Sequence, residues 1–215
     1  MFDDDSLRSQ ASLVAIEPHP SKKDRLVITF AGDLWREVDR SLFQKHQEAL
    51  KASLNSEELE KAFKALERQQ TRLYALRRIS QQAISERTLI RALQLRLIAP
   101  ETIEAVLVDF RQKGYLNDTE WARQYAASLQ RKRMGPRAIA QKLAIKGIPK
   151  ETIQAVLGSE EGQEEAILAL LETRYRSRDL KDPKERQKVI ASLARRGFEF
   201  EAILAAFTKY KKRVD

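Results

Sequence analysis

The sequence contains no cysteine among its 215 residues. This absence excludes a disulfide framework, a thiolate metal site and a cysteine nucleophile. Only two histidines are present, His19 and His46, and they do not have the spacing of a zinc-binding motif. The seven glycines stand singly, so there is no Gly-rich phosphate loop. We therefore predict no metal site, no cofactor and no catalytic residue, and we do not expect an enzyme.

Long apolar runs are also missing. No segment approaches the roughly 20 apolar residues that a membrane span requires. The chain begins with MFDDD, which is acidic where a signal peptide would be basic. These features predict a soluble cytoplasmic protein that does not contact a membrane. Without catalytic residues, we expect no small-molecule substrate.

Basic residues outnumber acidic ones: the chain has 40 Lys and Arg residues and 31 Asp and Glu residues, which gives a net charge of +9. Such an excess indicates either an anionic partner or a solvated surface on which basic residues happen to prevail. The basic residues cluster in the second half of the chain, which favours the anionic partner. Charged residues make up 33% of the chain and hydrophobic residues 42%, proportions typical of helices with one solvated face.

A repeat with a constant offset of fifty positions organises the chain. The offset aligns residues of the same character, namely Leu93, Leu143 and Leu193; Ile98, Ile148 and Phe198; Glu101, Glu151 and Glu201; Ile103, Ile153 and Ile203; and Ala105, Ala155 and Ala205. Matches of apolar, small and acidic positions in one register are typical of a tandem array. The sequence therefore predicts three repeat units.

The first forty residues have a different pattern. Residues 12–16 and 25–30 have strand character, and in the second segment Leu26, Ile28 and Phe30 alternate with the residues between them. A tight turn at residues 31–33 leads into a third short strand. We expect a small antiparallel sheet that packs on the first helices, because three short strands are marginally stable alone.

From Asp39 onward the pattern is helical. Asn55 can cap a long helix, and Glu58 stands where it can reach back to the helix start. The apolar stripe of this helix is predicted to run to about Ile79 and to contain Leu59, Ala62, Leu66, Leu73 and Leu76. A second helix is expected from Arg87 to Leu97, and a third starts at Ala99-Pro100, where proline suits the first helical position.

The second and third units repeat this pattern of residues that begin and end helices. Asn117 caps the first helix of the second unit, and Gly135-Pro136 and Pro149 start the next two. The predicted inward-facing residues are Trp121, Ala122, Tyr125, Ala126, Leu129, Ile139, Ala140, Leu143 and Ala144. Gly147 is expected to end the second helix, as Gly197 is in the third unit, because a left-handed cap favours a residue without a Cβ.

These patterns together predict an all-α fold of three tandem three-helix repeats in an elongated curved array, with a short N-terminal antiparallel β segment. The expected domains are an N-terminal extension with short strands and a helix (1–54) and three repeats (55–116, 117–161 and 162–215).

A motif of fixed order spans residues 114–148 and consists of GYLND-x-x-WA from Gly114 to Ala122, followed by Gly135, Ile139, Leu143 and Lys146-Gly147-Ile148. This motif resembles the signature of the RecX family of recombinase regulators. The segment LRRISQQAISERTLIRAL is similar to the first-repeat pattern of that family. The resemblance implies three tandem three-helix repeats, in agreement with the fifty-residue register.

Three positions depart from the family pattern. Asn117 stands where the family commonly has aspartate, and Trp121 replaces the usual phenylalanine. Leu97 occupies the position of a turn glycine in the first unit. We therefore expect that the helix before Leu97 cannot end in the left-handed cap predicted for the other two units.

The resemblance implies a regulatory protein that binds the RecA recombinase and its nucleoprotein filament. It would modulate, mainly by inhibition, the recombinase, ATPase and coprotease activities of RecA in DNA repair and the SOS response. Direct contact with single- or double-stranded DNA is also implied. Two alternatives stay open: a DNA-binding regulator that uses a helix-turn-helix-like pair, and a general scaffold without a nucleic-acid role.

The residues expected to meet the partner or DNA form a basic face. They are Arg131, Lys132, Arg133, Arg137, Lys142, Lys146, Arg174, Arg176, Arg178, Arg195 and Arg196. Ile145 lies among basic residues on its helix, and Leu95 holds the equivalent place in the first unit. Either these two apolar residues pack against a neighbouring repeat, or they are interface anchors.

Overall fold

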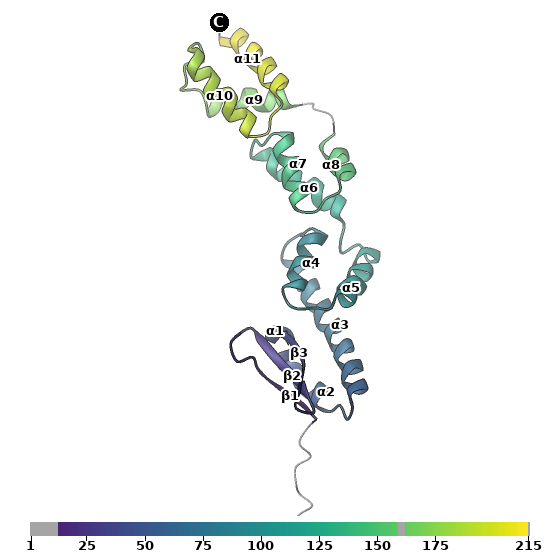
Figure 1. Cartoon of the computed structure of the whole chain (residues 1–215). Coiled ribbons are helices and arrows are strands. Elements are labelled where there is room, and N and C mark those ends of the chain that lie inside the picture. Colours follow the sequence, from purple (N-terminus) through teal and green to yellow (C-terminus); the bar gives the residue numbers. More distant parts are fainter. Residues whose placement is uncertain (1–12, 159–161, 215) are drawn as a thin grey trace, which may run out of the picture. The chain divides into compact units, whose positions relative to one another are not determined.

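The computed structural model describes residues 13–158 and 162–214, so Ser12, the predicted start of the first strand, lies outside the described residues. Figure 1 shows the elements along the chain. In order, they are β1 (Val14–Pro18), β2 (Arg25–Phe30), β3 (Asp33–Asp39), α1 (Arg40–Phe43), a 3-10 helix (Gln44–His46), α2 (Gln47–Lys51), α3 (Ser56–Gln81), α4 (Glu86–Gln94), α5 (Pro100–Gln112), α6 (Asp118–Arg131), α7 (Pro136–Ile145), α8 (Lys150–Leu157), α9 (Gln163–Thr173), α10 (Pro183–Arg195) and α11 (Phe200–Val214). The predicted helical fold with a small N-terminal sheet is confirmed.

The three strands form an antiparallel sheet in the order β1-β2-β3. Ala31 and Gly32 both have positive φ angles, 51° and 89°, which suits a two-residue turn whose twist matches that of the flanking strands. One face of the sheet is buried through Leu26, Ile28 and Val38. These residues belong to the same core cluster as the first helices, as predicted.

Helix α3 begins at the predicted cap. The Asn55 Oδ1 atom accepts a hydrogen bond of 2.9 Å from the Glu58 backbone N–H, and the Glu58 side chain accepts one from the N–H of Leu54. The helix contacts α1 and α2 as well as α5, so its buried face changes direction along its length. Inclusion of Leu73 in the apolar stripe is therefore wrong: Leu73 is 54% exposed, whereas Thr71 and Ala75 are fully buried.

The fifty-residue register corresponds to equivalent places in three groups of three helices, α3–α5, α6–α8 and α9–α11. Leu93, Leu143 and Leu193 all have 0% exposure, and the aligned residues Ile98, Ile148 and Phe198 are also buried. On α7, however, Ala144 is exposed, so the prediction that it faces inward is wrong. The buried stripe of this helix is narrow and is made by Ile139 and Leu143.

The end of α4 differs from expectation. Leu97 has a φ of +59°, so the prediction that this helix cannot end in a left-handed cap is wrong. The Ile98 N–H donates to the Leu93 carbonyl over 3.3 Å, as the Ile148 N–H donates to the Leu143 carbonyl over 3.2 Å. A non-glycine residue in this conformation costs about 1–2 kcal/mol. The cap leads directly to Ile98, which is buried in the core, and the free energy of that burial offsets the conformational cost at Leu97.

The start of the third helix is supported differently in each group. In the first, the buried Glu67 carboxylate accepts hydrogen bonds from the Ala99 N–H and the Thr102 hydroxyl, over 3.3 and 2.5 Å. In the third, the buried Gln163 carbonyl oxygen accepts from the Glu199 N–H over 3.2 Å. The aligned residue in the second group is Pro149, which has no N–H to satisfy.

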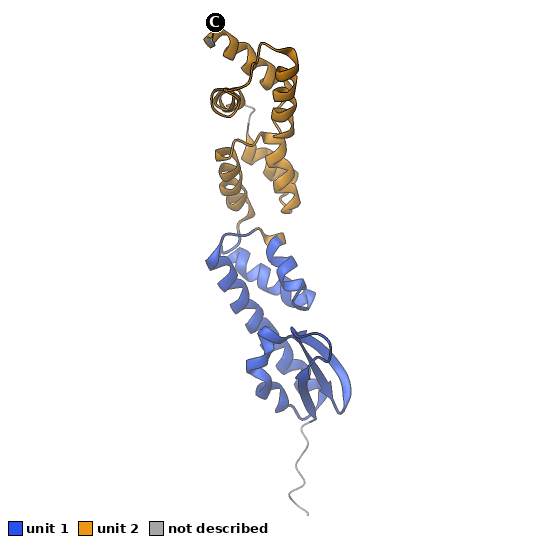
Figure 2. Cartoon of the chain, turned by 90° about the vertical axis from the view of Figure 1, so that its left-hand side faces the viewer, with its two compact units in different colours: residues 1–84, 88–116 blue, residues 85–87, 117–215 orange. Residues whose placement is uncertain are grey.

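The helices and strands divide into two compact units (Figure 2). Unit 1 comprises residues 1–84 and 88–116, and unit 2 comprises residues 85–87 and 117–215. The start of α4 thus belongs to unit 2. The division into an extension and three repeats at the predicted boundaries stays a prediction.

The common buried leucine allows a test of the register. Leu143→Ala removes a fully buried side chain from α7, so the free energy of unfolding should fall by about 2–5 kcal/mol. Ile145→Ala on the same helix is the matched control, because Ile145 is 68% exposed and the change should cost less than about 0.5 kcal/mol. Urea unfolding followed by circular dichroism measures both values. Equal losses for the two variants would contradict the register.

Candidate interaction surface

Helix α7 separates an apolar face from a basic face. Ile139 and Leu143 are buried against the core, whereas Arg137 and Lys142 are exposed. Lys146, at the C-cap, is half-buried. Arg137 and Lys146 stand at opposite ends of a helix of about three turns, which separates their Cα atoms by roughly 13 Å. The basic face therefore extends along the whole helix.

Two glycine turns bring further basic residues to the start of α7. The Gly135 N–H donates to the Arg196 carbonyl over 2.8 Å, and the Arg137 N–H donates to the Gly197 carbonyl over 3.1 Å. The Arg196 guanidinium in turn donates to the Arg133 carbonyl over 3.3 Å. This close approach of two backbones places the Arg131–Arg133 turn beside the end of α10.

The same kind of contact recurs in unit 2 fifty residues earlier. The Ser85 hydroxyl, which is aligned with Gly135, donates to the carbonyl of Lys146 over 3.0 Å. Gly147, at a φ of +86°, lies against the side chain of Arg87. A Cβ on Gly147 would overlap that side chain, whereas a Cβ on Gly197 would overlap the backbone of Ala138. Both turns therefore need a glycine for space as well as for conformation.

Acidic neighbours neutralise only part of this surface. The Arg137 Nε atom lies 3.8 Å from the Glu199 carboxylate, and Arg178 pairs with Glu185 at 2.9 Å. Hydrogen bonds from Lys188 and then Arg178 lower the pKa of Glu185, so this carboxylate stays ionised near Arg178. In contrast, Arg131, Lys132, Arg133 and Lys142 are exposed and form no ion pair with any residue that the structure describes.

The predicted basic residues do not all gather in one place. Arg174, Arg176 and Arg178 lie in the turns between α9 and α10, and no hydrogen bond or ion pair among the described residues links them to α7. Arg195 is exposed at the end of α10, next to Arg196. The structure thus brings together the basic residues around the two glycine turns, whereas those after α9 form a separate group.

The two candidate anchors are exposed. Leu95 has 72% and Ile145 68% of its surface accessible, so the interpretation that Ile145 packs against the neighbouring repeat of unit 2 is wrong, and Leu95 is not covered by the other residues of unit 1. The position aligned with them in the third repeat is Arg195. A role of Leu95 and Ile145 as interface anchors stays a prediction.

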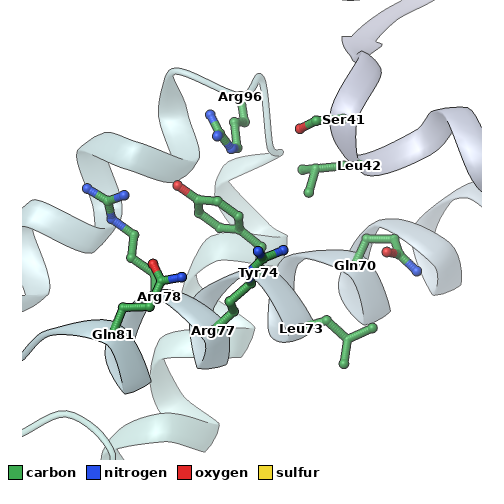
Figure 3. Close-up of a pocket in the computed structure, with 9 residues that line it drawn as sticks. All are labelled: Ser41, Leu42, Gln70, Leu73, Tyr74, Arg77, Arg78, Gln81 and Arg96. Atoms are coloured by element: carbon green, nitrogen blue, oxygen red, sulfur yellow. The ribbon is translucent and has the colours of Figure 1, made fainter.

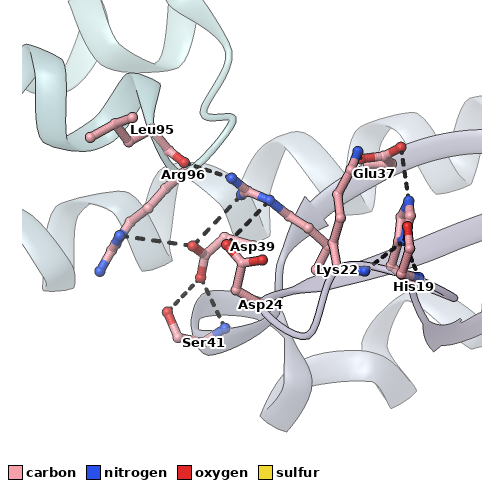
Figure 4. A network of polar contacts seen from close by, with 10 residues as sticks. His19, Lys22, Asp24, Glu37, Asp39, Ser41, Leu95 and Arg96 are labelled. Carbon is pink, nitrogen blue, oxygen red and sulfur yellow. Dashed lines mark hydrogen bonds and ion pairs between the residues drawn. The ribbon is translucent and has the colours of Figure 1, made fainter.

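Sequence reasoning missed a polar network in unit 1, shown in Figure 4. The buried Asp39 carboxylate accepts hydrogen bonds from the Ser41 N–H and hydroxyl, and it lies 3.9 Å from both Arg25 and Arg96. Nearby, a hydrogen bond from Lys22 lowers the pKa of Glu37. The sequence contains one sign of this network, because an aspartate two residues before a serine, as Asp39 and Ser41 are, is typical of a helix N-cap.

The comparisons with known proteins agree with this architecture. Residues 117–157 match the family model of the second three-helix domain of RecX, and residues 161–207 match that of the third. The regulatory protein RecX of Neisseria meningitidis serogroup C is 30% identical over 128 residues, which cover 60% of this chain and 82% of that protein. The regulatory protein RecX of a Thermus thermophilus strain is 32% identical over 134 residues, 62% of this chain and 87% of the relative.

A solved structure described as that of regulatory protein RecX has the same fold. It superposes with a TM-score of 0.62 at 23% sequence identity and covers 93% of this chain and 98% of the solved chain. Among the described residues, no helix is long and apolar enough to cross a bilayer, and no cluster of His, Asp and Glu could hold a metal ion.

The small sheet is followed in the sequence by tandem three-helix domains, which define a helical-repeat protein. The similarity to RecX proteins places it among the regulatory, non-enzymatic proteins of this kind. The chain belongs to the RecX family of regulatory proteins.

The glycine turn between α10 and α11 makes a test of the close backbone contact possible. Gly197→Ala and Gly162→Ala both place a Cβ at a positive φ, but only the Cβ at residue 197 meets a neighbouring segment. The conformational cost of about 1–2 kcal/mol is common to both, and overpacking should add about 1–3 kcal/mol for Gly197→Ala. Urea unfolding measures the difference. The close contact is refuted by equal destabilisation of the two variants.

Proposed function

We propose that this chain binds the RecA recombinase on its nucleoprotein filament and mainly inhibits the recombinase, ATPase and coprotease activities of RecA. This role belongs to DNA repair and the SOS response and goes with a cytoplasmic location. Membership of the RecX family supports the partner. The observation that carries the proposal is a group of exposed cations around α7 that have no acidic partner among the described residues, formed by Arg131, Lys132, Arg133 and Lys142.

The physical argument concerns unpaired charge. An exposed cation that already has an intramolecular partner gains little from a second one, whereas an unpaired cation is attracted by any anionic surface at no internal cost. A nucleoprotein filament offers such a surface in its DNA phosphates and in acidic patches of its protein subunits. Arg131, Lys132 and Arg133 lie at the end of α6 and in the turn before α7, and Lys142 lies on α7 itself, so several of these cations can contact one partner together.

A sequence-specific DNA-binding regulator is the alternative. The short helices α7 and α8 with the turn at Gly147 resemble a helix-turn-helix. In such a pair the second helix enters the major groove with its N-terminal residues. The first turn of α8 carries the exposed Glu151, and the aligned Glu101 and Glu201 open α5 and α11. Because a carboxylate at that place repels the DNA phosphates, the filament-binding role is favoured.

The direct test is the DNA-dependent ATPase activity of the cognate RecA protein with this chain added. We expect ATP hydrolysis to fall as the chain is titrated, and inhibition to weaken as the salt concentration rises. Rates unchanged at saturating amounts of the chain would contradict the proposal. Binding to a library of duplexes is measured beside it, because a strong preference for one duplex sequence would favour the DNA-binding regulator.

A charge-reversal variant tests the surface itself. Arg131→Glu, Lys132→Glu and Lys142→Glu are combined, because these side chains are exposed and unpaired among the described residues. The concentration for half-maximal inhibition should rise by at least about tenfold, since attraction becomes repulsion. The matched control combines Lys45→Glu, Lys61→Glu and Lys64→Glu, which change the net charge equally but lie in unit 1. Equal losses in both variants would show that only the net charge acts.

A further inference from the structure

Unit 1 contains a hollow of about 420 Å³ between α1, α3 and the turn after α4. Figure 3 shows its lining, with Tyr74 at the centre and Arg78 and Arg96 on different sides of its ring. The lining residues are Ser41, Leu42, Gln70, Leu73, Tyr74, Arg77, Arg78, Gln81 and Arg96. Three of them are arginines, and none is acidic. The hollow is therefore a concave site with a strong positive charge.

The described residues of unit 1 balance the charge of this site only in part. Neither Arg77 nor Arg78 forms an ion pair with any residue that the structure describes. Arg96 lies 3.9 Å from the Asp39 carboxylate, but Asp39 lies equally close to Arg25 and already accepts two hydrogen bonds from Ser41. Asp39 thus lies near Arg25, which also lies 3.6 Å from Asp24, and near Arg96, whereas Arg77 and Arg78 have no acidic partner in the described part of the chain.

The arginines also have unused donors. The Nε atoms of Arg78 and Arg96 are buried and have no hydrogen-bond partner among the described residues. Both Nε atoms are closed to solvent, so a ligand in the hollow would contact the terminal nitrogens of these guanidinium groups, which share the same delocalised charge. The Arg96 guanidinium lies 4.4 Å from the centre of the Tyr74 ring, which fixes the orientation of its planar group.

These features select a ligand class. Guanidinium groups bind phosphate oxygens through paired, charge-assisted hydrogen bonds, and a volume near 400 Å³ lies within the range of small-molecule sites. Beside the arginines, the Tyr74 ring and the Gln70 and Gln81 amides could contact a sugar or base. We propose that this hollow binds the phosphate of a nucleotide, which is supplied either free or within a single-stranded DNA chain.

The site is distinct from the basic surface around α7, because all its lining residues belong to unit 1. Its occupation needs no recombinase, so it can be tested on the full chain without any other protein. Absence of nucleotide binding would not contradict the proposed inhibition of RecA, and absence of inhibition would not contradict nucleotide binding at this hollow.

The test is a calorimetric titration of the full chain with thymidine monophosphate, thymidine and a short oligothymidylate. Thymidine, which lacks the phosphate, should bind at least about tenfold more weakly than its monophosphate. Arg77→Gln combined with Arg78→Gln should weaken monophosphate binding by at least about tenfold. The matched control is Lys61→Gln combined with Arg68→Gln, which removes two exposed cations from the same helix and should leave binding within about twofold.

The two sources are separated by the oligothymidylate. If the double variant weakens its binding as well, the site accepts a nucleotide of a DNA strand; if only monophosphate binding falls, the site takes free nucleotides. Absence of monophosphate binding, or equal losses in the double variant and its control, overturns the inference. Circular dichroism checks folding, and Arg77→Glu alone repeats the test at an exposed position of the lining should the double variant unfold.

Discussion

The contact between a turn glycine of one repeat and the start of a helix in the preceding repeat is the constraint on which unit 2 depends. At Gly197 the neighbouring backbone leaves no space for a Cβ, and at Gly147 the Arg87 side chain fills that space. Hydrogen bonds from Gly135 and Ser85 to the carbonyls of Arg196 and Lys146 fix the approach in both cases. Within unit 2, directional hydrogen bonds to backbone carbonyls therefore join residues 85–87 to the end of α7, and the start of α7 to the end of α10.

This constraint also positions the charged surface. The carbonyls of Lys146 and Arg196 accept hydrogen bonds from Ser85 and Gly135, which fixes the backbone at both residues, and both residues are half-buried there. Arg133, whose own carbonyl accepts from Arg196, is held at the same place. Arg133 and Arg196 thus owe their proximity to the contact between the two glycine turns.

Much of the fold could be predicted from the sequence, because the residues that begin helices and fill the core act on their immediate surroundings. Proline at the start of α5, an N-cap at Asn117 and the leucines at fifty-residue spacing each act through the backbone or the nearest core. Leu73 and Leu97 could not be predicted correctly, since their outcomes depend on which neighbours a helix meets. The Tyr74 hollow was missed for the same reason: its arginines come from segments that only the fold brings together.

The three helix starts at Ala99, Pro149 and Glu199 make the repeats less interchangeable than their common register implies. The buried Glu67 accepts the hydrogen bond of the Ala99 N–H, and the buried Gln163 accepts that of the Glu199 N–H. Pro149 has no N–H, so the second start requires no acceptor. Exchange of α5 and its cap Ala99 for α8 and its cap Pro149 would leave Glu67 buried without its backbone donor. Each repeat is thus matched to its own first helix, so substitutions at these two places must occur together.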